Sequence, residues 1–236
     1  MKKLFIILPA FNEVKVIGRV LDDLKKELKH LKQLKQFKEL EPVIIVVDDA
    51  SSDKTGKIAR KKGMVVLRHV INRGLGGALA TGLEYARINN ADIAVTMDSD
   101  GQHDPQDLHK IIKPIVEKKA EVVIGSRFLE RSNSIPWDRK PVLWASNIIT
   151  FLFFGIYTTD SQSGFRAFSK RAIKKIKLKT QRMEVSSELF DQIKKNNLRL
   201  MEVPIKVIYT PYSREKGQSN LNALKILVKL ILRLAR

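Results

Sequence analysis

The sequence predicts an α/β fold, a mostly parallel β-sheet with helices on both faces. Two observations lead to this prediction. Strand-like and helix-like segments alternate through the first 125 residues, which is typical of strand–helix–strand units. The strand-like segments are continuously apolar, as expected of strands that are buried on both faces. With 236 residues, 44% of them hydrophobic, the chain can bury one large core or two small ones.

The alternation can be followed along the chain. The expected strands are short apolar runs, at residues 4–8, 43–47, 64–67, 93–97 and 122–125. The expected helices carry apolar residues at helical spacing, and they cover residues 14–28, 53–62, 76–88 and 105–116. Ser51 and Ser52 are candidate N-caps for the second of these helices.

The regular alternation stops after residue 125. Residues 142–157 are strongly apolar and form either an amphipathic surface or a plain core helix. We expect a polar loop over residues 160–168, a helix over residues 184–195 and a strand over residues 200–209. The second half of the chain is therefore predicted in less detail than the first.

Polar residues follow each of the first four expected strands. These clusters cover residues 9–13, 48–51, 72–76 and 98–100. Because parallel α/β sheets bind ligands at the carboxyl ends of their strands, we expect the four clusters to meet at one edge. They are also more acidic than solvated loops on such a basic chain need to be. The sequence thus predicts a binding site at this edge.

Asp98-Ser99-Asp100 is the cluster with the clearest chemistry. Two carboxylates that are two residues apart, just past a buried strand, can both reach one divalent ion. Mg²⁺ or Mn²⁺ accepts oxygen ligands and keeps positions open for substrate phosphates. Gln102 could add a carbonyl oxygen, and the ion would neutralise a diphosphate leaving group. The alternative is a turn with solvated acids.

Two other clusters each have two interpretations. Asp48 and Asp49 could accept a hydrogen bond from a nucleobase, or they could interact with a helix N-terminus. The glycine-rich turn at residues 72–77 could bring backbone N–H groups close to a phosphate, or it could be a tight loop that needs positive φ. No Gly-Lys-Ser/Thr follows it, so it is not a P-loop.

The charge of the chain restricts its partners. The 44 Lys and Arg residues against 25 Asp and Glu give a net charge of +19, which suits nucleic acid, an anionic membrane or phosphorylated substrates. A nucleic-acid-binding module would not explain the acidic clusters, so we expect no nucleic acid partner. A nucleotidyltransferase, the other alternative, usually has a glycine- and lysine-rich loop after its first strand, and residues 9–13 are not such a loop. A NAD-dependent oxidoreductase has its glycine turn after the first strand, whereas the turn at residues 72–77 follows the third, so this class is disfavoured. With no cysteine, the chain has no disulfide and no thiol nucleophile.

Six motifs, in order, resemble those of family 2 glycosyltransferases with the GT-A fold. Four are Pro9-Ala10-Phe11-Asn12-Glu13, Val47-Asp48-Asp49-Ala50-Ser51, Asn72-Arg73-Gly74 and Asp98-Ser99-Asp100-Gly101-Gln102-His103. The other two resemble the polyprenyl-phosphate branch of the family: residues 160–168 and Arg214-Glu215-Lys216-Gly217-Gln218-Ser219. The resemblance covers residues 3–221. It implies transfer of a sugar from a nucleotide-sugar to a polyprenyl or dolichyl phosphate.

The resemblance also implies roles for single positions. The nucleoside would be held by Pro9, Phe11, Glu13, Asp48 and Asp49, within a nucleotide-binding set that includes Asn72, Arg73, Gly74, Asp98 and Ser99. The metal would be held by Asp98, Asp100 and Gln102. The donor and acceptor phosphates would lie near Arg127, Arg139, Arg166, Arg214 and Ser219, and Glu188 would lie near the reaction centre.

Since the acceptor phosphate is already an oxyanion, the implied reaction needs little or no general base and inverts the sugar carbon. Relatives often carry Lys where this chain has Leu75 and Asn220, and mannose synthases tend to have Asp-Ala-Asp-Leu where this chain has Asp98-Ser99-Asp100-Gly101. The latter difference favours UDP-GlcNAc or UDP-glucose as the donor, with GDP-mannose next. For His103 and His109 we expect surface or capping roles.

The last residues suit a membrane interface. We expect a catalytic domain over residues 1–220 and an amphipathic helix over residues 221–236, with Lys225, Lys229 and Arg233 forming one cationic stripe. Such a helix is about 24 Å long, short of the roughly 30 Å hydrocarbon core of a bilayer. We therefore expect peripheral association with the cytoplasmic face of the membrane. The alternative is docking on the protein's own core or on a second copy in a homo-oligomer.

Overall fold

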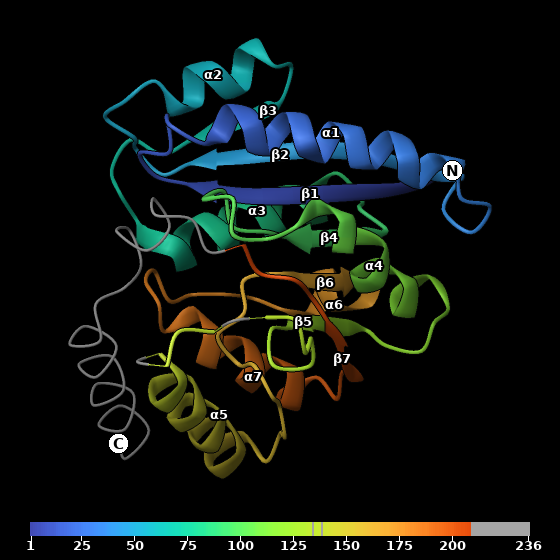
Figure 1. Ribbon diagram of the computed structural model, residues 1–236, viewed down its shortest axis with the longest axis vertical. Helices are drawn as coiled ribbons and strands as arrows, with labels where there is room; N and C mark the ends of the chain where they lie inside the picture. The colour runs from blue at the N-terminus through green and yellow to red at the C-terminus, as the bar shows by residue number, and fades with distance from the viewer. Residues whose placement is uncertain (134, 138, 209–236) are drawn as a thin grey trace.

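The computed structural model describes residues 1–133, 135–137 and 139–208. It contains a seven-stranded sheet with the strand order β3-β2-β1-β4-β6-β5-β7, and helices cover both faces (Figure 1). This confirms the expected α/β architecture. Arg214, Ser219 and the expected helix over residues 221–236 lie outside the described residues.

The first half of the chain alternates as predicted. Its elements are β1 (Lys2–Ala10), α1 (Ile17–Gln33), β2 (Leu40–Asp48), α2 (Thr55–Lys61), β3 (Val65–Arg68), α3 (Gly74–Ile88) and β4 (Ile93–Thr96). β1 pairs in parallel with β2 and β4, and β2 pairs in parallel with β3. The carboxyl ends of these four strands therefore point to one edge of the sheet.

The second half adds three strands, one of which runs against the others. Its elements are the 3₁₀ helix η1 (Pro105–Asp107), α4 (Leu108–Val116), β5 (Val122–Ser126), α5 (Lys140–Phe154), β6 (Arg166–Ser169), α6 (Lys170–Lys175), α7 (Val185–Lys195) and β7 (Leu200–Pro204). β6 lies between β4 and β5 and is antiparallel to both. The expected loop over residues 160–168 is wrong at its end, because Arg166 begins this strand.

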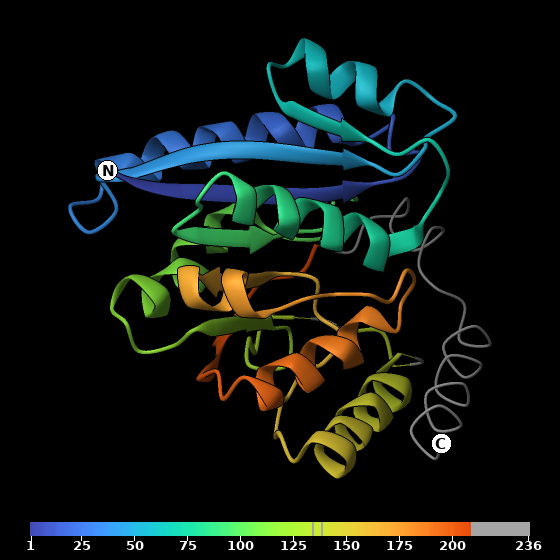
Figure 2. The ribbon, with the colours of Figure 1, turned by 180° about the vertical axis from the view of Figure 1, so that it is seen from behind.

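The continuous apolar character of β1 has a direct structural cause. Leu4, Ile6 and Leu8 pack into the core beneath α1 and α4, whereas Phe5 and Ile7 pack into a second core beneath α3, α6 and α7. Figure 2 shows α3, α6 and α7 on the face opposite α1 and α4. Both faces of the strand are thus buried, so successive side chains are all apolar.

Ser51 and Ser52 do not cap α2, contrary to the prediction. The helix begins at Thr55, and its N-cap position, Lys54, makes no capping hydrogen bond through its side chain. Instead the backbone N–H of Asn12 donates to Ser51 Oγ at 3.0 Å, and the N–H of Ser52 donates to Asn12 Oδ1 at 2.8 Å. The two serines join the loops that follow β1 and β2.

α5 is not a core helix. Three of its 15 residues are buried, Ile149, Thr150 and Phe154, whereas Trp144 is 68% and Leu152 is 70% exposed. The alternative of a plain core helix is therefore wrong, and an exposed apolar surface is what the structure has. No helix in the part of the chain that the structure describes combines the length and the apolar character needed to cross a bilayer.

Candidate active site

The acidic pair after β4 opens into a cavity at the carboxyl edge of the sheet. The cavity has a volume of about 430 Å³. It is lined by Pro9, Ala10, Phe11, Glu13, Asp49, Asn72, Gly74, Leu75, Ala78, Asp98, Ser99, Asp100, Arg182 and Met183. The polar clusters that follow β1, β2, β3 and β4 therefore meet at one place, as the sequence predicts.

Two neighbours, His103 and Gly164, determine where the Asp98 carboxylate lies. Its Oδ2 lies 3.1 Å from His103 Nε2. A Cβ atom added at Gly164 would lie 2.5 Å from both carboxylate oxygens, so a glycine is needed for the carboxylate to sit here. His103 is buried and its ring packs on Phe165 at 5.2 Å. The expected surface or capping role is wrong for His103, which supports Asp98 instead.

The two carboxyl groups differ in their pKa values. Burial raises the pKa of the Asp100 carboxyl to about 6, and the nearby charge of Asp98 adds to this effect. Burial acts on Asp98 in the same direction, but the hydrogen bond and charge of His103, with the charges of Arg166 and Arg127, lower its pKa. At neutral pH both groups carry negative charge close together, an arrangement that a cation stabilises.

The donor set fits a divalent metal ion. Asp98 and Asp100 are both partly exposed to the cavity and supply hard oxygen ligands. Within the described ranges, no group of three or more His, Cys, Asp or Glu side chains is placed to hold a metal. An ion bound by the pair would take its other ligands from water or substrate phosphates, as Mg²⁺ usually does. Gln102 lies in the same turn, where its backbone N–H donates to Asp100 Oδ1 at 2.9 Å.

The β1 end of the cavity supplies an apolar and an acidic surface. Phe11 is 46% exposed, whereas Glu13 is buried, with its N–H donating to Thr55 Oγ1 at 2.8 Å. The hydroxyl of Ser99 donates to the carbonyl of Pro9 at 2.7 Å and so ties the β4 turn to the end of β1. Ser99 thus acts at this site through the backbone it holds.

Asp48 and Asp49 have different environments. Asp48 is fully buried, accepts from the N–H of Ser51 at 2.9 Å and pairs with Arg68 at 2.8 Å. It is not among the described residues that line the cavity. Asp49 does line the cavity, and its carboxylate also accepts from the N–H groups of Arg73 at 2.8 Å and Gly74 at 2.7 Å. Asp49 therefore holds the N-terminus of α3, as one of its two interpretations expected.

The glycine-rich turn is shaped by a neighbouring chain segment. Gly74 has a φ of 76°, and a Cβ atom there would lie 2.7 Å from the carbonyl oxygen of Gln181. The N–H of Gly77 donates to the same oxygen at 2.9 Å. The glycines thus allow residues 179–183 to lie directly against the start of α3. The tight-loop interpretation is confirmed for Gly74.

Two of the predicted arginines, Arg127 and Arg166, lie near the acidic pair, since their charges lower the pKa of Asp98. Arg127 makes two hydrogen bonds of 2.7 Å to Asp160 through its guanidinium. Arg166 is buried, donates to the carbonyl of Ser161 at 3.0 Å, and has its pKa lowered by burial to about 10, so it stays charged at neutral pH. Arg139 is half-buried at the N-cap of α5.

Glu188 is engaged with the 179–183 segment. Its carboxylate accepts from the N–H of Lys179 at 2.8 Å, and from the N–H of Thr180 at 2.9 Å and its hydroxyl at 2.6 Å. Glu188 is not among the described residues that line the cavity. The structure therefore places it behind the wall of the site rather than in it.

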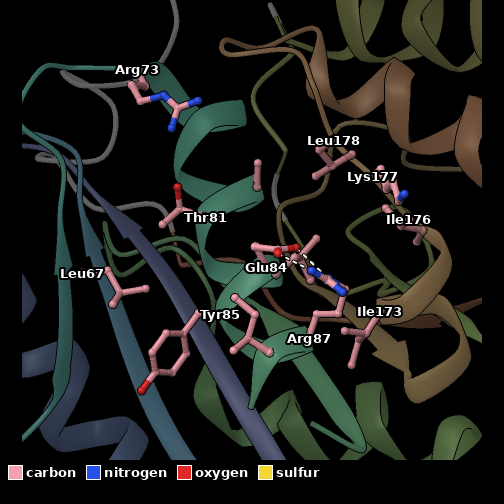
Figure 3. Close-up of a pocket in the computed structure, with 13 residues that line it drawn as sticks. Leu67, Arg73, Thr81, Glu84, Tyr85, Arg87, Ile173, Ile176, Lys177 and Leu178 are labelled. Carbon is pink, nitrogen blue, oxygen red and sulfur yellow. Dashed lines mark hydrogen bonds and ion pairs between the residues drawn. The ribbon is translucent and has the colours of Figure 1, made fainter. Parts of the chain in front are cut away.

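A second cavity, of about 720 Å³, lies between α3 and α6 (Figure 3). Leu67, Leu83 and Ile173 contribute to its apolar lining. Among the described residues that line it, the one carboxylate is Glu84, which pairs with Arg87 at 2.7 Å (Figure 3). Among its described lining residues there is no pair of carboxylates that could hold a metal, unlike in the cavity at the strand ends.

Comparison with known proteins shows the family of the chain. Residues 5–177 match the family model described as glycosyl transferase family 2. The chain belongs to this family. It is 46% identical over 98% of its length to an uncharacterized protein of Methanocaldococcus jannaschii, 91% of which is covered. It is 38% identical to the UDP-N-acetylglucosamine–dolichyl-phosphate N-acetylglucosaminyltransferase of Methanococcus voltae, over 98% of this chain and 96% of that one.

Solved structures of the same fold are similar over most of the chain. Glucosyl-3-phosphoglycerate synthase from Mycobacterium tuberculosis, in complex with Mn²⁺, uridine-diphosphate and phosphoglyceric acid, gives a TM-score of 0.69 at 18% sequence identity. The similarity covers 99% of this chain and 78% of the synthase. At this identity the likeness shows the fold, which is the GT-A arrangement that the motifs imply.

Proposed function

We propose that the protein transfers a sugar from a nucleotide-sugar to a polyprenyl or dolichyl phosphate at a membrane surface. The observation that carries the proposal is the pair Asp98 and Asp100, which faces a cavity built from four strand ends. The relative from Methanococcus voltae, which is 38% identical over 98% of this chain, supports UDP-GlcNAc as the donor. UDP-glucose and then GDP-mannose are the next candidates.

The proposed reaction needs no proton transfer. An oxygen of the acceptor phosphate attacks the anomeric carbon, the bond from that carbon to the diphosphate oxygen breaks, and the nucleoside diphosphate leaves. A Mg²⁺ or Mn²⁺ ion on Asp98 and Asp100 would supply charge neutralisation for that leaving group. The protein's part is to position both phosphates and to stabilise the developing charge.

We place the acceptor phosphate near Arg127. Another cavity of about 430 Å³ is lined by Phe128, the residue after Arg127 in the sequence. Its other lining residues are Trp144, Asn147, Ile148, Phe151, Tyr157, Thr158 and Thr159. Asp160, which follows Thr159, holds Arg127 in place. An isoprenoid chain in this mostly apolar cavity would bring its phosphate toward Arg127. The side chains therefore suit both ends of an amphipathic acceptor.

α5 supports the membrane part of the proposal. Trp144, Ile148, Phe151 and Leu152 follow helical spacing, and all four side chains are exposed. Trp137 and Tyr157, which flank the helix, are 84% and 79% exposed. A contiguous exposed apolar surface with aromatic residues is typical of a helix that lies in a membrane interface. The same helix lines the apolar cavity, so a lipid acceptor could enter from the membrane.

A transfer assay tests the proposal. The protein is incubated with radiolabelled UDP-GlcNAc, UDP-glucose or GDP-mannose, dolichyl phosphate and Mn²⁺, and the lipid fraction is extracted and counted. We expect label in the lipid with one donor, and none after chelation of the metal. If none of the three donors labels the lipid, with folded protein and metal present, the proposal is contradicted.

A further inference from the structure

The segment of residues 179–183 forms part of the wall of the cavity at the strand ends, and neighbouring elements hold it on both sides. Glu188 accepts hydrogen bonds from the N–H groups of Lys179 and Thr180. On the other side the carbonyl of Gln181 accepts from the N–H of Gly77 at 2.9 Å. The segment is thus tied both to α7 and to the glycine-rich start of α3. These hydrogen bonds fix the backbone of the segment, and so they fix where its side chains enter the cavity.

Two of its side chains, Arg182 and Met183, line the cavity. Among the described residues that line it, the other charged side chains are Glu13, Asp49, Asp98 and Asp100, all of them acidic. Among the described residues, Arg182 is the one Lys or Arg that lines this cavity. A nucleoside diphosphate that enters would meet four carboxylates, which repel its phosphates unless cations intervene.

We infer that Arg182 is a donor-binding residue that contacts the diphosphate of the nucleotide-sugar. The inference rests on the proposed function, since it assumes a nucleoside diphosphate in this cavity. The guanidinium of arginine presents planar donors that match two phosphate oxygens. Arg182 is exposed, so its side chain can adjust to a ligand without breaking a buried contact. Glu188 is the corresponding positioning residue, because it holds the segment and does not line the cavity.

This assignment was not available from the sequence. Arg182 lies between the expected loop and the expected helix, in no recognised motif, on a chain with 44 Lys and Arg residues. Its significance depends on the packing of Gln181 against Gly74, which brings a late segment of the chain to the start of α3. The charge of the cavity then distinguishes Arg182 from the other basic residues.

The test compares binding of a nucleoside diphosphate with binding of its nucleoside. UDP, GDP, uridine and guanosine are titrated in the presence of Mn²⁺ into the wild type and into Arg182→Ala, Arg182→Lys and Arg171→Ala. Arg171 is the matched control, since it pairs with Glu121 at 3.0 Å and does not line the cavity. We expect Arg182→Ala to weaken diphosphate binding by about 10- to 100-fold, the range for a lost hydrogen bond to a charged group. Arg182→Lys should restore part of it.

The nucleoside decides between a contact and a structural role. If Arg182 touches the diphosphate, nucleoside binding stays at the wild-type level in Arg182→Ala. Equal losses for diphosphate and nucleoside, or wild-type diphosphate binding, would overturn the inference. The failure of the proposed function is distinguishable, because the wild type itself would then bind neither diphosphate.

Discussion

Replacing Asp100 by asparagine should stabilise the metal-free protein while removing its metal site. The pKa of the Asp100 carboxyl is raised from 3.8 to about 6. A folded pKa above the unfolded one means that folding favours the protonated carboxyl. The contribution of this group to stability is therefore fully present below pH 3.8 and is lost as the pH rises through about 6. A rise of about two pKa units at about 1.36 kcal/mol each amounts to about 3 kcal/mol at pH 7.

Asparagine keeps the shape of the side chain and the oxygen that accepts from the N–H of Gln102, but it carries no charge. Because the carboxylate is partly solvated, we expect about 1 to 3 kcal/mol of added stability for Asp100→Asn at pH 7. For a chain of this length, that is a rise in Tm of about 2 to 10 °C. At pH 4.5, where the wild-type carboxyl is protonated in the folded state, about two-thirds of the difference should disappear. The rest should disappear below pH 3.8, where the carboxyl is protonated in the unfolded state too.

The assay is thermal unfolding of both proteins at pH 7 and pH 4.5, with and without Mn²⁺. We expect the metal to raise the Tm of the wild type at pH 7 and to leave that of Asp100→Asn nearly unchanged. Sugar transfer by the variant should be lost. A variant that is no more stable than the wild type at pH 7 would refute the electrostatic argument, and a variant that is stabilised by Mn²⁺ as much as the wild type would refute the assignment of the ligand.

Three further predictions concern the floor of the metal site and the membrane surface. Gly164→Ala would force a methyl group to within 2.5 Å of the Asp98 carboxylate oxygens, so we expect weaker Mn²⁺ binding by calorimetry in a protein that still folds, and wild-type affinity would argue against Asp98 as a ligand. Trp144→Ser combined with Leu152→Ser should reduce co-sedimentation with anionic liposomes. Val70→Ser, at a residue between β3 and α3 that is 97% exposed, should not. Equal effects would contradict the membrane role of α5. Removing residues 221–236 should weaken liposome binding more than nucleotide binding, and unchanged partitioning would indicate that this stretch docks on protein.

The sequence predicted the parallel part of the fold because the signal there is strong and local. β1, β2 and β4 are buried on both faces, so their apolar runs are unbroken and flanked by loops. β6 gave no such signal. It has four residues, Arg166–Ser169, it begins with a charged side chain, and the six-residue α6 follows it at once. What makes it a strand is its position between β4 and β5, a tertiary contact that periodicity does not record.

The site was predicted unevenly for a similar reason. Asp98 and Asp100 were found because their spacing alone brings two carboxylates together. The close approach of Gly164 to Asp98 joins the end of β4 to a loop more than 60 residues later, so no local pattern reports it. His103 is only five residues from Asp98, but its burial against Phe165 is again a long-range contact. Ser51 and Ser52 were assigned to a cap because serine before a helix is a common signal. In the folded chain, both serines form hydrogen bonds with Asn12 in the loop after β1 instead.

Calorimetric titration of UDP and GDP, each with and without Mn²⁺, tests the central claim most directly. The acidic pair at Asp98 and Asp100 and the cavity that it faces predict that one nucleotide binds, and that its binding depends on the metal. We expect UDP to be that nucleotide. If folded protein binds neither nucleotide with Mn²⁺ present, the claim that this cavity holds a nucleotide-sugar is wrong, and the positive charge of the chain would need another partner.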